Sequence, residues 1–149
     1  MSARGKQALS RALFTSGRQD WGTPDDIFAD LHAEFGFTVD VCAHKDNAKL
    51  PRYWSPSENA LWQSWKGERC WMNPPYSEIG RWMSRAFEAW EAGAFVVALV
   101  PSRTDTRWWH DYAMKATEIR FVKGRLRFGG SANGAPFPSA VLIFGQMPA

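Results

Sequence analysis

The chain has 149 residues, of which 45% are hydrophobic and nine are tryptophan, and its formal net charge is +3. This composition predicts one globular domain with a substantial core and excludes a disordered chain. No apolar run approaches the roughly 20 residues of a membrane span. The two cysteines and three histidines show neither a disulfide framework nor metal-ligand spacing, so we expect a reduced, cytoplasmic protein without a metal site.

The positive charge gathers at the start of the chain. Four basic residues precede Asp20, the first acid, and the stretch 1–19 is otherwise small and polar. We therefore predict a flexible basic tail over residues 1–19 and a single domain over residues 20–149. The other 14 of the 18 basic residues are outnumbered by the 15 acidic residues, so the rest of the chain is close to neutral. Overall charge is thus weak evidence for a nucleic-acid partner.

The first periodic segment predicts a helix that begins at Pro24 and ends before Gly36. Thr23 is expected to cap the helix, with Pro24 at the first helical position and two acids at the positive end of the helix dipole. Apolar residues recur at helical spacing, and Gly36 is expected to end the helix. Residues 37–41 then alternate in the manner of a short strand.

The middle of the chain alternates between irregular and regular segments. Residues 44–67 show no clean period apart from a short helix expected around Leu61. Residues 69–72 predict a brief strand that delivers Asn73 at its carboxyl end. A second helix should follow, capped by Ser77 and stopped by Gly93.

The last third of the chain is rich in strand signals. The predicted elements are a buried strand over 94–100, a helix over 104–115, and short strands over 119–122, 126–128 and 141–144, with a long glycine-rich connection over 129–138. Strands that alternate with helices predict an α/β fold, with a mostly parallel sheet and an antiparallel edge. Ligands of such sheets bind beyond the carboxyl ends of the strands, where both Asp40 and Asn73 should lie.

The segment Asn73-Pro74-Pro75-Tyr76 carries the most specific chemistry. Two prolines stiffen the backbone and remove two amide donors. Asn73 offers an acceptor oxygen, Pro74 a carbonyl and Tyr76 a flat aromatic face. These groups suit a planar ligand that carries an amine, although an ordinary strand-to-helix turn has the same residues.

A basic cluster lies further along the chain. Residues 101–127 contain seven basic residues and three acids. Such a cluster is suited to phosphate contacts, with Arg103, Arg125 and Arg127 as candidates, but a solvated helix face and strand edge would look similar.

These segments together resemble a known family. Asn73-Pro74-Pro75-Tyr76 after a strand, with Trp21-Gly22-Thr23-Pro24 and Asp40-Val41-Cys42-Ala43 upstream, resembles the phage-type DNA N-6-adenine methyltransferases, the compact Dam-like family. The likeness includes segments 124–128 and 136–139. It implies an S-adenosylmethionine-dependent methyltransferase that acts on adenine in DNA. The implied fold is Rossmann-like, with helices on both faces, and abbreviated because only residues 42–68 separate its first two strands.

The resemblance also implies roles for individual residues. The Asn73-Pro74-Pro75-Tyr76 turn would hold the target base, which has to leave the duplex to reach it. The residues expected to border the cofactor are Trp21, Thr23, Pro24, Asp40, Cys42 and Ala43. The glycine-rich loop of larger methyltransferases is absent, and residues 43–47 stand in its place. Asn59 stands where relatives often carry an aspartate.

Several alternatives stay open at this point. The same turn serves methyltransferases that modify adenine in RNA or a glutamine amide in proteins, because the amine chemistry is alike. A nucleic-acid-binding module that kept the fold and lost catalysis is a second class. A tryptophan-rich structural or assembly protein is a third, although it leaves the proline pair unexplained. No oligomeric state or target sequence is predicted.

Overall fold

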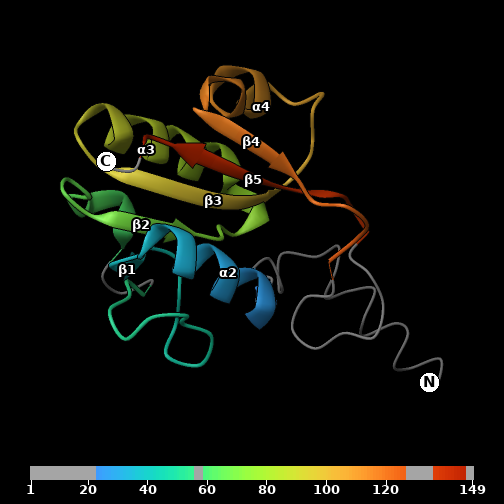
Figure 1. The fold of residues 1–149 in the computed structure, drawn as a ribbon. Coiled ribbons are helices and arrows are strands. Elements are labelled where there is room, and N and C mark those ends of the chain that lie inside the picture. The colour runs from blue at the N-terminus through green and yellow to red at the C-terminus, as the bar shows by residue number, and fades with distance from the viewer. Residues whose placement is uncertain (1–22, 56–58, 127–135, 147–149) are drawn as a thin grey trace.

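The computed structural model describes residues 23–55, 59–126 and 136–146 (Figure 1). The predicted tail over 1–19 and most of the predicted strand over 126–128 lie outside these ranges. Five strands form one sheet in the order β1-β2-β3-β5-β4. The strands are β1 (Val39–Asp40), β2 (Arg69–Met72), β3 (Phe95–Pro101), β4 (Glu118–Phe121) and β5 (Ser139–Phe144).

The sheet is mostly parallel, as predicted, but its antiparallel strand is not at an edge. β1, β2 and β3 run parallel, and β5 pairs antiparallel with both β3 and β4. β4 therefore runs in the same direction as β1, β2 and β3 and takes the edge. The predicted antiparallel edge is wrong because all six residues of β5 are buried, which a strand achieves between two neighbours and under both helical layers.

Helix α2 (Asp25–Phe35) ends at Gly36, as predicted, and the φ of 63° at Gly36 gives the left-handed conformation of a helix terminus. Its predicted start is wrong by one residue. Pro24 occupies the capping position and makes no side-chain bond there. The Thr23 hydroxyl instead accepts a hydrogen bond from Asn73, so it is committed to a distant part of the chain.

The remaining helices are shorter than their apolar patterns indicate. A 3-10 turn, η2 (Tyr76–Glu78), precedes α3 (Ile79–Glu91), so Ser77 lies inside the turn and the predicted Ser77 cap is wrong. The predicted helix over 104–115 is divided into α4 (Arg107–Asp111), capped by the Thr106 hydroxyl, and η3 (Ala113–Lys115).

The first strand and the segment that follows it are irregular. β1 covers two residues instead of the predicted five, and Asp40 forms an isolated parallel bridge with Tyr53. The short helix expected near Leu61 is confirmed as the 3-10 turn η1 (Ala60–Trp62).

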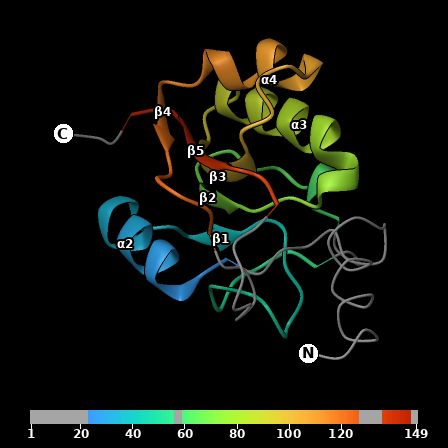
Figure 2. The same ribbon diagram turned by 90° about the vertical axis from the view of Figure 1, so that its right-hand side faces the viewer.

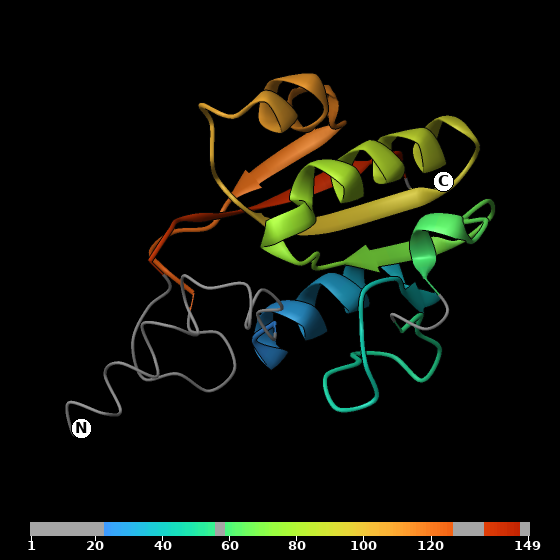
Figure 3. The same cartoon turned by 180° about the vertical axis from the view of Figure 1, so that it is seen from behind.

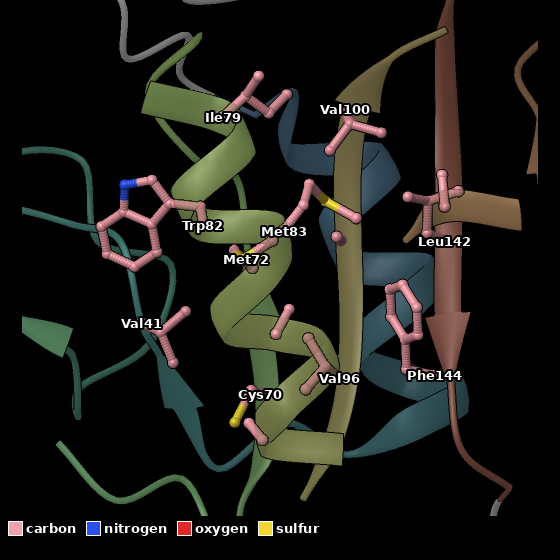
Figure 4. Close-up of a cluster of buried hydrophobic side chains, with 14 of the residues drawn as sticks. Val41, Cys70, Met72, Ile79, Trp82, Met83, Val96, Val100, Leu142 and Phe144 are labelled. Carbon is pink, nitrogen blue, oxygen red and sulfur yellow. The ribbon is translucent and has the colours of Figure 1, made fainter. Parts of the chain in front are cut away.

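Helices cover both faces of the sheet, as expected (Figures 1, 2 and 3). α2 packs one face through Phe28, Leu31 and Phe35 against residues such as Trp71 and Val97. α3 and α4 cover the other face. Figure 4 shows part of this second cluster, whose labelled residues are Val41, Cys70, Met72, Ile79, Trp82, Met83, Val96, Val100, Leu142 and Phe144.

Within the described residues, no helix has the length and apolar character to cross a membrane. The same part of the chain holds no group of three or more His, Cys, Asp or Glu side chains arranged to bind a metal ion.

The α3–sheet packing predicts the stability cost of one core substitution. Met83 is fully buried between α3 and the sheet, whereas Met114 is 58% exposed. Met83→Ala should lower the free energy of unfolding by about 2–5 kcal/mol, because it leaves a cavity that the sheet cannot fill. The exposed control, Met114→Ala, should change it by less than about 0.5 kcal/mol. Urea unfolding followed by tryptophan fluorescence measures both, and equal effects would contradict the packing.

Candidate active site

The polar residues singled out from the sequence meet at one edge of the sheet. Asp40 ends β1, and Asn73 directly follows β2. These strands are parallel neighbours, with Asp40 in register with Trp71, two residues before Asn73. Both side chains are buried, with 3% of Asp40 and 9% of Asn73 exposed. The expectation that the two residues share the carboxyl edge is confirmed.

A buried hydrogen bond fixes the Asn73 side chain. Its Nδ2 donates to Thr23 Oγ1 over 2.9 Å, across 50 residues of sequence. Thr23 is 5% exposed and stands just before α2. The bond therefore ties the start of α2 to the end of β2. It also sets the orientation of the carboxamide, whose oxygen faces away from the Thr23 hydroxyl.

The proline pair carries the chain stiffly from Asn73 into η2. Pro74 is buried and Pro75 is extended, with φ −64° and ψ 134°. Tyr76 follows and meets Phe137 edge to face, with ring centroids 5.2 Å apart. The Arg103 guanidinium lies 5.8 Å from the Phe137 ring centroid. Burial raises the pKa of Tyr76, with Arg103 opposing the shift, so the phenol stays neutral at physiological pH.

Phe137 is the residue of this cluster that the sequence reasoning left out of the site. Its segment, 136–139, contributed only to the family resemblance. Phe137 is 5% exposed and belongs to the α2-side core cluster. An aromatic residue between two prolines was the available signal, but its meeting with Tyr76 depends on how β5 pairs in the sheet.

Asp40 organises the loop after β1. Its two carboxylate oxygens accept hydrogen bonds from the backbone amides of Cys42 (3.2 Å) and Lys49 (3.1 Å). Burial raises the pKa of Asp40 from 3.8 to about 6, and the two amide bonds and the Lys49 charge partly offset the shift. The aspartate thus closes residues 42–49 into a compact loop in place of a glycine-rich turn.

The other predicted site residues are distributed around this edge. Cys42 is half-buried, and buried Ala43 donates its amide to the Trp54 carbonyl over 3.1 Å. Pro24 is half-buried and its carbonyl accepts from Phe28 N. Arg125 is exposed beyond β4. Trp21 and Arg127 lie outside the described residues.

Within the part of the chain that the structure describes, the buried polar atoms near this edge that lack a hydrogen-bond partner include Trp82 Nε1, Ser102 Oγ and Ser139 Oγ. Ser102 follows β3, and Ser139 opens β5 opposite Pro101. Figure 4 shows the indole nitrogen of Trp82 turned toward the Ile79 end of α3, which follows the Tyr76 turn. Buried polar groups in proteins are normally paired with protein, water or ligand. These atoms therefore mark positions where a bound molecule would find partners.

The environment of Asp40 predicts a pH-dependent local titration. The backbone amide signals of Cys42 and Lys49 should titrate together with a midpoint near pH 6 and should not titrate in Asp40→Asn. Because folding raises this pKa, Asp40 favours folding most below about pH 4, and that contribution is lost as pH rises through 6. NMR of the labelled protein measures the midpoint, and a value near 4 would contradict the burial of the carboxyl group.

Comparison with known proteins identifies the family to which the chain belongs. The model of the family "DNA N-6-adenine-methyltransferase (Dam)" matches residues 11–142. The DNA N-6-adenine-methyltransferase of Haemophilus phage HP1 is 31% identical over 123 residues, covering 80% of this chain and 71% of the relative. The enzyme of the same name from Escherichia phage T1 is 29% identical over 111 residues, covering 73% of this chain and 47% of that relative, about half its length. The chain belongs to the DNA N-6-adenine-methyltransferase (Dam) family.

Proposed function

We propose that this chain transfers a methyl group from S-adenosylmethionine to the exocyclic amino group of adenine in DNA. Family membership and the names of the two phage relatives support the reaction. The observation that carries the proposal is the Asn73 carboxamide, which Thr23 locks at the carboxyl edge of the sheet beside Tyr76 and Phe137.

The edge suits the proposed cofactor. S-adenosylmethionine supplies an electrophilic methyl group on a sulfonium, and its ribose and amino-acid end need donors and acceptors. Trp82 Nε1 and Ser139 Oγ, which have no partner among the described residues, offer such groups. The Asp40 loop replaces the glycine-rich turn of larger methyltransferases and gives the sheet edge a fixed wall. The residues that would border the cofactor are Trp21, Thr23, Pro24, Asp40, Cys42 and Ala43.

The chemistry assigned to the turn is positioning. The adenine amino nitrogen is a weak nucleophile, since its lone pair is delocalised into the ring. Asn73 Oδ1 and the Pro74 carbonyl would accept its two hydrogens and favour a pyramidal nitrogen whose lone pair faces the methyl group. A carboxamide is not a strong base, so the amine proton would leave for solvent only after the nitrogen has displaced the sulfur from the methyl group.

Tyr76 and Phe137 would form the walls for the adenine ring. The target base has to leave the duplex to reach a buried turn, as bases do in other enzymes that modify them. Arg103, which lies over Phe137, would meet the phosphates next to that base, with Arg125 and Arg127 extending the basic surface. We further propose that the adjacent parallel strands β1, β2 and β3 form the ligand-binding half of an abbreviated Rossmann-like fold, within a single domain over residues 20–149.

The proposal predicts N6-methyladenine in DNA from cells that express the chain. Sequencing that detects this base should reveal a recurrent modified site, and Asn73→Ala should abolish it because the amine loses its acceptor. Purified protein with labelled cofactor, given DNA, RNA and a protein mixture side by side, identifies the substrate class. Label in RNA or protein alone, or unchanged transfer by Asn73→Ala, would overturn the proposal.

The Thr23–Asn73 bond predicts a graded effect on the rate. Thr23→Ala should lower kcat about tenfold, roughly the 1.4 kcal/mol expected of one buried hydrogen bond. Thr23→Ser keeps the hydroxyl and should stay within about threefold of the wild type. Calorimetry with S-adenosylmethionine distinguishes positioning from cofactor contact. A Thr23→Ala protein with normal kcat and weakened cofactor binding would contradict the positioning role.

A further inference from the structure

An exposed aromatic side chain lies at the carboxyl end of β4, the strand farthest from β1 in the sheet. Phe121 is the last residue of β4 and is 68% exposed. β4 lies at the end of the strand order, so it is an edge strand of the described sheet (Figure 1). Exposed apolar residues on edge strands favour unwanted pairing between chains, so natural proteins tend to avoid them. Phe121 therefore offers an apolar contact to a partner.

Neighbouring residues in β4 show to which face of the sheet the Phe121 side chain points. Ile119, two residues earlier and hence on the same side of β4, packs on the cluster under α3 and α4. Arg120 points to the other face, where its guanidinium pairs with Glu34 of α2 over 2.6 Å. Phe121 therefore leaves the sheet on the α3–α4 side, whereas Phe137 packs in the cluster on the α2 side.

The strand register places Phe121 level with the Asn73-Pro74-Pro75-Tyr76 turn. Phe121 pairs with Ala140, and Ala140 pairs with Val100. Extending the β2–β3 register sets Val100 beside Pro74. Three strand spacings of about 4.8 Å put Phe121 roughly 14 Å from the turn. That distance is comparable to the roughly 12 Å width of the DNA major groove.

Two basic residues, Lys123 and Arg125, follow Phe121 on the exposed chain. The Arg120 guanidinium, by contrast, is paired with Glu34 and Glu118. Phosphate groups are attracted to such a surface. An exposed aromatic ring among basic residues suits a duplex, whose stacked bases can receive a wedge between backbone phosphates.

We propose that Phe121 is a wedge that enters the duplex next to the target adenine and stabilises the DNA from which that base has left. The proposal rests on the function proposed above. Proteins that insert apolar side chains between base steps use the unstacked step to bend or open the duplex. Phe121 would thus act on the DNA from one side while Tyr76 and Phe137 receive the base on the other.

The test uses a duplex that carries a site methylated by the wild-type protein. In one version the target adenine faces thymine, and in the other it faces an abasic position, which leaves the adenine already unpaired. Phe121→Ala should lower kcat/KM about tenfold on the paired duplex, because the unstacked base step loses its apolar contact, and less than about twofold on the abasic duplex, where the adenine is already unpaired. Phe121→Trp should keep the wild-type ratio.

The matched control is Trp62→Ala, an aromatic residue that is 82% exposed on η1 and is expected to leave both rates unchanged. Equal loss on both duplexes, or no loss on the paired one, would overturn the wedge. Sedimentation tests the other occupant, a second copy of the chain. If the wild-type protein is a dimer, if Phe121→Ala makes it a monomer, and if kcat/KM falls equally on both duplexes, Phe121 serves self-association. A wild-type protein that methylates no adenine in DNA overturns the proposed function instead.

Discussion

The hydrogen bond between Thr23 and Asn73 is the constraint on which the site depends. It joins the residue before α2 to the residue after β2, and both partners are buried. A carboxamide on a free turn would sample several rotamers and present either its oxygen or its nitrogen. With Nδ2 committed to Thr23, the two ends of the group are distinguished before any ligand arrives. In the proposed reaction, this preorganisation would contribute to catalysis because the carboxamide needs no reorganisation during methyl transfer.

At the same edge, hydrogen bonds to the Asp40 side chain hold a loop in a chain that lacks a glycine-rich turn. Larger methyltransferases use glycines to bring the backbone close to the cofactor. Here the Asp40 carboxylate gathers the amides of Cys42 and Lys49 and closes the loop through a side chain. The arrangement buries an ionisable group, and burial raises the pKa of Asp40 to about 6. A fixed loop is therefore obtained together with a protonation change near pH 6 that a glycine turn does not have.

Sequence reasoning succeeded where the signal is local. The apolar stripe of α2, its end at Gly36 and the delivery of Asn73 by β2 follow from periodicity and turn chemistry within a few residues. It failed where distant residues compete. Thr23 does not cap α2 because its hydroxyl accepts from Asn73, 50 residues away. Phe137 was missed because only the pairing of β5 between β3 and β4 brings it to Tyr76, and strand order is not written in local sequence.

The place of β5 within the sheet also affects how the protein is made. β4 is synthesised before β5, yet β5 is its pairing partner in the sheet. At about 5–20 residues per second, the chain from the end of β4 to the end of β5 takes roughly one to five seconds to emerge from the ribosome. During that interval the inner edge of β4 and the apolar flank of β3 have no neighbour. The nascent chain therefore exposes unpaired strand edges, which chaperones can bind, until β5 has been synthesised.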